Sequence, residues 1–288
     1  MTAGARRDKL RTVLAGAACV RPASVHDAVS MRIAARLGYE LGMLGGSTAA
    51  LAVLGDPDLV LITLTELAEQ VRRMSRAASL PVLVDADHGY GNALNVRRTV
   101  QELEAAGAAG LTIEDTLLPQ AYGEAKTQLV SVAEGVGKMK AALDGRGERN
   151  LVIIGRTGAA VVAGVDEAIA RGRAYEAVGV DALFFTGLKT RQDLQTVAAA
   201  TRLPLILGNT TGELDDAAFL ASQRVRIANQ GHAPFQAAVQ AIYDTMKALR
   251  EGTPPKALKV VASGALMGEV SEEAAHAARA ADWLGLKT

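Results

Sequence analysis

Short apolar runs alternate with amphipathic segments eight times along this 288-residue chain. Each apolar run has the length of a β-strand, and each is followed by polar or glycine residues. The runs start at residues 18–20 and end at 225–228, and the segments between them repeat apolar residues with the helical period. Strands joined by helices run parallel, and eight such units favour a closed (β/α)8 barrel over an open, doubly wound sheet. The sequence therefore predicts an α/β fold of the TIM-barrel class.

The two ends of the chain lie outside this eightfold pattern. Residues 7–15 precede the first strand and predict an extra N-terminal helix. A Pro-Pro pair at 254–255 ends the last long helical segment, and one further helix is expected at 271–284. We therefore predict a barrel catalytic domain over residues 1–252 and a helical C-terminal extension over residues 253–288.

Composition argues against several classes of protein. The chain has 31 basic and 31 acidic side chains, so its charge gives no reason to expect nucleic acid or an anionic membrane as a partner. No apolar run reaches the roughly 20 residues that span a bilayer, and the N-terminus lacks the apolar region of a signal peptide. Cys19 is the only cysteine, which suits a reducing compartment. We expect a cytoplasmic protein that binds neither nucleic acid nor membranes.

The stretch that carries the clearest chemical signal follows the apolar run 80–84. Asp85 and Asp87 come directly after this run, close to two glycines and to Asn92, where a helix is expected to begin. Two carboxylates at the end of a buried strand are costly unless a cation or hydrogen-bond donors lie between them. A turn at Asp87 would let both reach one cation, the second through water. The alternative is that they cap the following helix.

Two more carboxylates favour the cation. Glu114 ends the next strand, and neighbouring strands of a barrel lie about 5 Å apart. Asp58 follows the second strand and adds a fourth carboxylate. A set of oxygen ligands without cysteine indicates Mg²⁺, with Mn²⁺ as the alternative, rather than Zn²⁺. We predict that Asp58, Asp85, Asp87 and Glu114 form a metal site at the mouth of the barrel.

Further polar residues at strand ends predict contacts to a small anionic substrate. Gly46, Ser47 and Thr48 offer backbone N–H groups and two hydroxyls to a carboxylate or phosphate, although an ordinary glycine-rich turn would have the same sequence. Asn209 also follows a strand, and we include it among the expected substrate-binding residues.

Arg156 and His232 are the expected catalytic and substrate-binding side chains. Arg156 follows the apolar run 151–154 and needs an anionic partner, which is either a substrate carboxylate or Glu114. His232 comes directly after the last strand and could be a ligand, a proton donor or an anion-binding group. A lone histidine with a purely structural role is the alternative for His232.

These motifs, taken together in their order along the chain, resemble the isocitrate lyase/phosphoenolpyruvate mutase superfamily. The resembling stretches are Gly45–Ser47, Pro57–Leu59, Val84–Asn92, Ile113–Asp115 and Arg156–Thr157. Within the superfamily, the segment from Asp85 to Gln120 is similar to the oxaloacetate decarboxylase branch. The resemblance covers roughly residues 15 to 250, so it includes nearly all of the expected barrel.

The resemblance implies a role for each residue of the expected site and a quaternary structure. Asp85 would be the direct Mg²⁺ ligand, and Asp58, Asp87 and Glu114 would hold metal-bound waters. Ser47 would bind a substrate carboxylate. Superfamily barrels exchange their last helix between two subunits and usually assemble as a dimer of such dimers, so the resemblance implies a helix-swapped homotetramer.

The resemblance also implies a lyase that converts oxaloacetate, a 2-oxo dicarboxylate, to pyruvate and CO₂ through a metal-stabilised enolate. Superfamily lyases carry a catalytic cysteine on the loop after Glu114, but residues 120–126 contain none, which argues against cleavage of isocitrate or methylisocitrate. Two enzymatic alternatives use the same site, namely phosphonopyruvate or phosphoenolpyruvate chemistry and another 2-oxo acid lyase. The third alternative is a barrel that binds 2-oxo acids without turnover.

Overall fold

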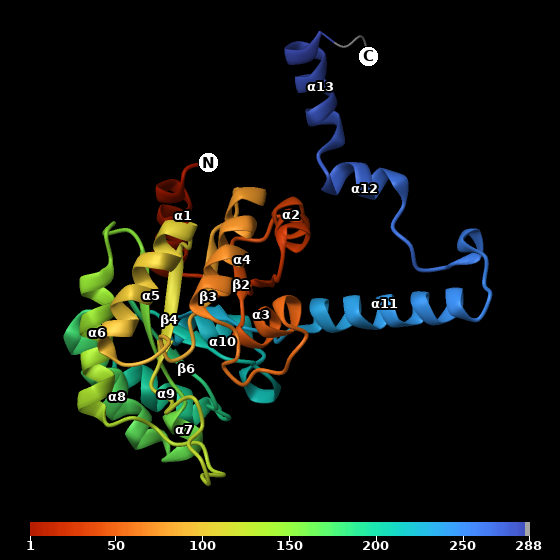
Figure 1. The fold of residues 1–288 in the computed structure, drawn as a ribbon. Coiled ribbons are helices and arrows are strands. Elements are labelled where there is room, and N and C mark those ends of the chain that lie inside the picture. The colour runs from red at the N-terminus through yellow and green to blue at the C-terminus, as the bar shows by residue number, and fades with distance from the viewer. Residues whose placement is uncertain (286–288) are drawn as a thin grey trace. The chain divides into compact units, whose positions relative to one another are not determined.

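The eight strands form one parallel sheet in the order β1 to β8 in the computed structural model, which describes residues 1–285 (Figure 1). The strands are β1 (Ala23–Ser24), β2 (Gly42–Leu44), β3 (Val82–Asp85), β4 (Gly110–Glu114), β5 (Val152–Thr157), β6 (Ala182–Phe185), β7 (Leu205–Leu207) and β8 (Val225–Ala228). Val20, just before β1, pairs in parallel with Ile227 of β8. The sheet thus closes on itself, and the predicted (β/α)8 fold is confirmed.

Within the described residues, the barrel unit also contains ten α-helices, and all of them except α1 lie in the connections between strands. They are α1 (Ala3–Ala15), α2 (Ala28–Arg36), α3 (Gly46–Val53), α4 (Leu64–Ala77), α5 (Ala93–Ala106), α6 (Val132–Gly145), α7 (Ala159–Val162), α8 (Val165–Val178), α9 (Arg191–Ala200) and α10 (Ala217–Ser222), with a 3₁₀ turn η1 (Gly212–Leu214). Local signals set where they begin. Thr63 and Glu66 form a reciprocal capping box at α4, and the side chain of Asn92 accepts two backbone N–H bonds at α5.

The extra N-terminal helix closes one end of the barrel. Leu10 and Leu14 of α1 pack in the same buried cluster as inward-facing strand residues such as Leu83 and Ile206. Arg11 of α1 donates hydrogen bonds to the backbone oxygens of residues 149–151, which lie at the N-terminal end of β5. Helix α1 thus covers the N-terminal ends of the strands, opposite the C-terminal ends where the active sites of such barrels lie.

The residues from Ala233 onward form a second compact unit. It contains α11 (Ala233–Arg250), the 3₁₀ turn η2 (Pro255–Ala257), α12 (Gly264–Val270) and α13 (Glu273–Leu284), so the helix expected at 271–284 is confirmed. The last three residues of the predicted extension, 286–288, lie outside the described residues. Within residues 1–285, no helix has both the length and the apolar character needed to cross a membrane.

Candidate active site

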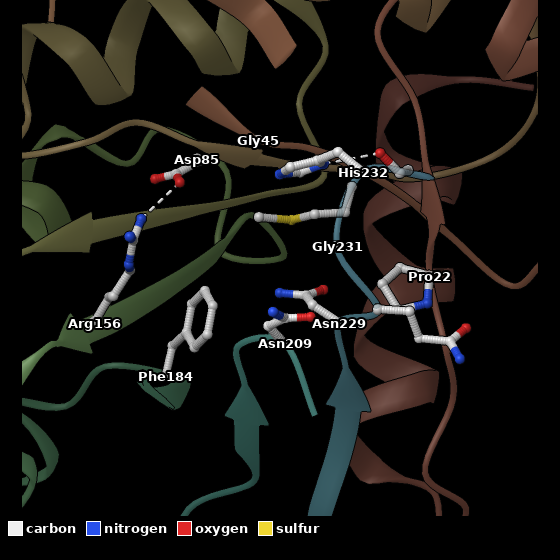
Figure 2. Close-up of a pocket in the computed structure, with 12 residues that line it drawn as sticks. Pro22, Gly45, Asp85, Arg156, Phe184, Asn209, Asn229, Gly231 and His232 are labelled. Atoms are coloured by element: carbon white, nitrogen blue, oxygen red, sulfur yellow. Dashed lines mark hydrogen bonds and ion pairs between the residues drawn. The ribbon is translucent and has the colours of Figure 1, made fainter. Parts of the chain in front are cut away.

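Polar side chains from the C-terminal ends of the strands line a cavity of about 150 Å³ (Figure 2). Its lining residues are Pro22, Ser24, Met43, Gly45, Asp85, Arg156, Phe184, Asn209, Asn229, Gln230, Gly231 and His232. Asp85 ends β3, Arg156 lies in β5, and Asn209 and His232 follow β7 and β8. The parallel barrel therefore brings four of the predicted site residues, distant in sequence, to one cavity.

Arg156 lies between two of the predicted metal-site carboxylates. One terminal nitrogen, Nη1, is 2.6 Å from Oδ2 of Asp85, and the other, Nη2, is 3.2 Å from Oε2 of Glu114. Glu114 and Arg156 are register partners in β4 and β5, which explains their proximity. Burial lowers the pKa of Arg156, but the two carboxylates more than offset this effect, so the pKa is raised and the guanidinium stays charged. Of the two anionic partners expected for Arg156, Glu114 is in contact with it, and a substrate carboxylate stays a prediction.

The backbone turns sharply at Asp87 and buries its carboxylate beside α3. Asp87 has a φ of 47°, and its N–H donates to Oδ1 of Asp85 at 3.2 Å. A Cβ at position 46 would lie 2.7 Å from Oδ1 of Asp87, so any other residue there would displace this carboxylate. Burial raises the pKa of Asp87 to about 8, and the nearby charges of Asp85, Asp58 and Glu114 add to this increase. The predicted turn at Asp87 is present.

The charges of this cluster fit a hydrated divalent cation. Burial and mutual repulsion raise the pKa of Asp58, Asp87 and Glu114, while the single guanidinium of Arg156 lowers it. With four carboxylates around one guanidinium, further positive charge would stabilise the cluster. Among the residues that the structure describes, no three Asp, Glu, His or Cys side chains come close enough to hold a metal by themselves. Such a set suits Mg²⁺, which commonly binds one or two carboxylates and keeps several waters.

His232 is fixed on the opposite side of the cavity from Arg156 (Figure 2). Its Nδ1 lies 2.9 Å from Oγ of Ser24. The ring packs so closely on Gly45 that a Cβ there would be 2.5 Å from Cε1. Burial lowers the pKa of His232, although Asp85 and Asp58 partly oppose this, and the lower pKa favours the neutral imidazole. With Nδ1 occupied by Ser24, Nε2 is the nitrogen that can exchange a proton with a ligand.

The N-terminus of α3 adjoins the cavity at Gly45. Gly45 is the N-cap and provides no side-chain hydrogen bond, so the first N–H groups of α3, including those of Gly46 and Ser47, have no side-chain cap. Thr48 is buried, and its hydroxyl donates to the carbonyl of Gly45 at 3.0 Å. The hydroxyl of Thr48 therefore stabilises the first turn of α3. Binding of substrate by residues 46–48 stays a prediction.

Several residues of the site were not selected from the sequence. Thr112 donates its hydroxyl to Oδ1 of Asp85 at 3.2 Å, and Ser24, Phe184, Asn229 and Gln230 line the cavity. Thr112 lies two residues before Glu114 in β4, so the two-residue period of a strand could have placed both on the inner face. Ser24 and Asn229 stand at strand ends, where the rule that located Asp85 and His232 applies equally.

Comparison with known proteins finds one matching family model and relatives that are similar over nearly the whole chain. A family model described as phosphoenolpyruvate phosphomutase matches residues 10–250. A protein of Bradyrhizobium diazoefficiens named oxaloacetate decarboxylase is 68% identical over 282 residues, which are 98% of each chain. One of Rhodopseudomonas palustris BisB18, with the same name, is 64% identical over 287 residues and the whole of both chains.

Solved structures with the same fold are more distant in sequence. A phosphonopyruvate hydrolase in complex with oxalate and Mg²⁺ has a TM-score of 0.85 at 28% identity and covers 99% of this chain and 100% of its own. An oxaloacetate acetylhydrolase in complex with its product oxalate has a TM-score of 0.84 at 25% identity, covering 97% of this chain and 99% of its own.

Proposed function

Because this chain belongs to the phosphoenolpyruvate phosphomutase family, we propose that it is a carboxy-lyase that converts oxaloacetate to pyruvate and CO₂ with a divalent cation, preferably Mg²⁺. The observation that carries this proposal is the cluster of carboxylates around Asp85, which shares one cavity with Arg156 and His232. The relatives named oxaloacetate decarboxylase support the choice of substrate, and the solved hydrolase with oxalate and Mg²⁺ supports the choice of metal.

The proposed reaction breaks the bond between C3 and C4 of oxaloacetate. The electron pair of this bond moves towards the C2 carbonyl oxygen as CO₂ leaves, and C3 then accepts a proton to give pyruvate. Asp85 would hold the cation directly, and Asp58, Asp87 and Glu114 would hold its waters. The chemistry that the cation supplies when bound is Lewis-acid stabilisation of negative charge on the substrate oxygens.

The protein's own groups position the substrate. The uncapped N–H groups of Gly46 and Ser47 suit the C1 carboxylate, because a helix N-terminus favours anions. Arg156 remains positively charged and balances part of the charge of the cluster and the substrate. The Nε2 of neutral His232 is the group we assign to proton delivery at C3, since Ser24 holds the other ring nitrogen.

The experiment that tests the proposed function compares substrates under one set of conditions. Oxaloacetate, phosphonopyruvate and other 2-oxo acids are supplied with Mg²⁺, then with EDTA, and the products are followed by NMR. We expect release of pyruvate and CO₂ from oxaloacetate in excess of the uncatalysed rate, and loss of this excess with EDTA. Turnover of phosphonopyruvate alone would contradict the proposal, and binding without turnover would indicate a binding protein.

The raised pKa of Asp87 predicts how pH affects metal binding. Its pKa is about 8 in the folded, metal-free protein and about 3.8 when unfolded, so the folded state retains the proton longer. Asp87 therefore contributes stability below about pH 4 that is lost as pH rises to about 8. A dication favours the ionised carboxylate, so the increase in Tm caused by Mg²⁺ should grow with pH until about pH 8.

Thermal unfolding with and without Mg²⁺ between about pH 6 and about pH 9 checks this prediction. The matched control is Asp87→Asn, which has nearly the same shape and no proton to release. In this variant, the Mg²⁺-induced increase in Tm should be smaller and nearly independent of pH. A wild-type increase that is flat over this range would show that Asp87 does not titrate with the metal.

We also propose that residues 1–252 act as one catalytic domain and that α11 packs on a partner subunit in a homotetramer. None of the eighteen residues of α11 is buried within the chain. Its exposed apolar side chains lie on one face at helical spacing, namely Val239, Ile242, Tyr243, Met246 and Leu249. An exposed apolar face of this length is typical of an interface.

Cys19, whose pKa burial raises to about 11, suits a reducing cytoplasm.

Replacing Ile242 with glutamate should therefore weaken assembly. We expect the wild-type chain to show about four times its 29.9 kDa mass in size-exclusion chromatography with light scattering, and Ile242→Glu to show a smaller species. Lys247→Glu, a charge change in the same helix, is the control and should assemble normally. A monomeric wild-type protein at micromolar concentration would contradict the proposed assembly.

A further inference from the structure

Neutral carboxamides line the part of the cavity that lies away from Asp85 and Arg156 (Figure 2). Arg156 is the only guanidinium among the lining residues, and its two terminal nitrogens already contact Asp85 and Glu114. The remaining polar lining residues are Ser24, Asn209, Asn229 and Gln230, which carry no formal charge, and His232, whose pKa is lowered by burial. A second carboxylate of a bound diacid would thus meet amide and hydroxyl groups instead of a free cation.

Asn209 and Asn229 are held together by the last two strands. The N–H of Thr210 donates to the carbonyl of Asn229 at 3.1 Å, and the N–H of Asn229 donates to the carbonyl of Leu207 at 3.0 Å. Figure 2 shows both carboxamide groups directed into the cavity, in the region between Phe184 and Pro22. The backbone of Asn209 has a φ of 36°, a conformation that asparagine tolerates better than most residues. Both side chains are therefore positioned by the fold itself.

The carboxamide of Asn229 has an unmet hydrogen-bonding requirement. Its Oδ1 is buried without a hydrogen-bond partner. Because Oδ1 can only accept, it is satisfied by a donor such as water, and the part of the side chain that suits a carboxylate is the NH₂ group. The NH₂ of an asparagine offers two donors, and a carboxylate accepts up to four hydrogen bonds.

We propose that Asn209 and Asn229 bind the C4 carboxylate of the substrate, the group that leaves as CO₂. This inference rests on the proposed function and adds the residues that select a diacid. Neutral donors suit this role because the C4 carboxylate loses its charge as the C3–C4 bond breaks. A cation would stabilise this charge more in the reactant than in the transition state, which would slow the reaction.

The test compares two ligands that differ at this end of the molecule. Asn229→Asp and Asn209→Asp retain the side-chain shape but bring a negative charge next to the C4 carboxylate. We expect each variant to lower kcat/KM for oxaloacetate by about 10- to 100-fold. Oxalate lacks the C4 carboxylate, so its inhibition constant should stay within about twofold of the wild-type value. Gln192→Ala removes an exposed amide on α9 and should change neither constant.

The outcomes separate this inference from the proposed function. An equal loss for oxaloacetate and oxalate, or no loss for either, would overturn the role of the two asparagines. If the wild-type protein binds oxaloacetate without decarboxylating it, the proposed function fails. The inference is then tested by dissociation constants measured for the two variants. The constant must increase for oxaloacetate and remain unchanged for oxalate.

Discussion

Replacing Asp85 with asparagine is expected to lower Mg²⁺-dependent decarboxylation of oxaloacetate by about 10³-fold or more. Loss of one preorganised electrostatic group at a reaction centre costs about 10²- to 10³-fold, and loss of the direct metal ligand removes the Lewis acid as well. Asparagine keeps the shape of the side chain and can still accept hydrogen bonds from Thr112 and from the N–H of Asp87. The fold should therefore survive, while both turnover and the Mg²⁺-induced increase in Tm are lost.

The control for this prediction is Asp166→Asn, an exposed aspartate in the first turn of α8. It removes one negative charge and should leave kcat and the Mg²⁺ response unchanged. Pyruvate production with saturating Mg²⁺ measures kcat, and a Mg²⁺ titration followed by thermal unfolding measures binding. An Asp85→Asn variant with turnover close to that of the wild type would show that Asp85 is not the metal ligand.

The largest effect on stability is expected from Asp115→Asn. Asp115 is fully buried beside the site, and its Oδ2 accepts hydrogen bonds from Tyr175 Oη at 2.7 Å and from Arg171 Nη1 at 3.0 Å. The substitution removes the buried one of the two carboxylates that pair with Arg171, and breaking a buried ion pair typically costs about 3–5 kcal/mol of unfolding free energy. A domain of this size should then unfold roughly 6–20 °C lower.

Asp115 also supports the active site through its backbone. Its carbonyl accepts the N–H of Val130 at 2.9 Å, and Thr116 pairs with Leu129, so both ends of the 117–129 loop are tied together next to Glu114. The control is Glu167→Gln, because Glu167 is the more exposed of the two carboxylates that contact Arg171. This control should cost less than about 1 kcal/mol. Equal losses from the two variants would show that burial of Asp115 is not the cause.

The positions of the site residues were predictable because a parallel barrel gathers strand ends. Asp85, Arg156, Asn209 and His232 all lie at or just after the C-terminal ends of strands, and all four line one cavity. The contacts between them were only partly predictable. The pairing of Arg156 with Asp85 depends on the register between β3, β4 and β5, and the spacing of residues along the chain does not predict this register.

Other features depended on contacts between residues distant in sequence. No local pattern indicates that Asp115 contacts Arg171 and Tyr175, which follow it by 56 and 60 residues. The hydroxyl of Thr48 was considered for a ligand, but it bonds to the carbonyl of Gly45, a local contact that helix N-termini commonly make. Asn229 is not among the predicted site residues, although it follows β8 directly, as His232 does three residues later.

A crystal structure with Mg²⁺ and oxalate tests the central claim most directly, because oxalate mimics the C1 and C2 end of oxaloacetate. We predict that the ion contacts a carboxylate oxygen of Asp85 directly and reaches Asp58, Asp87 and Glu114 through water. Oxalate should bind this ion and the N–H groups at the start of α3. An ion held away from Asp85, or oxalate bound outside this cavity, would contradict the account.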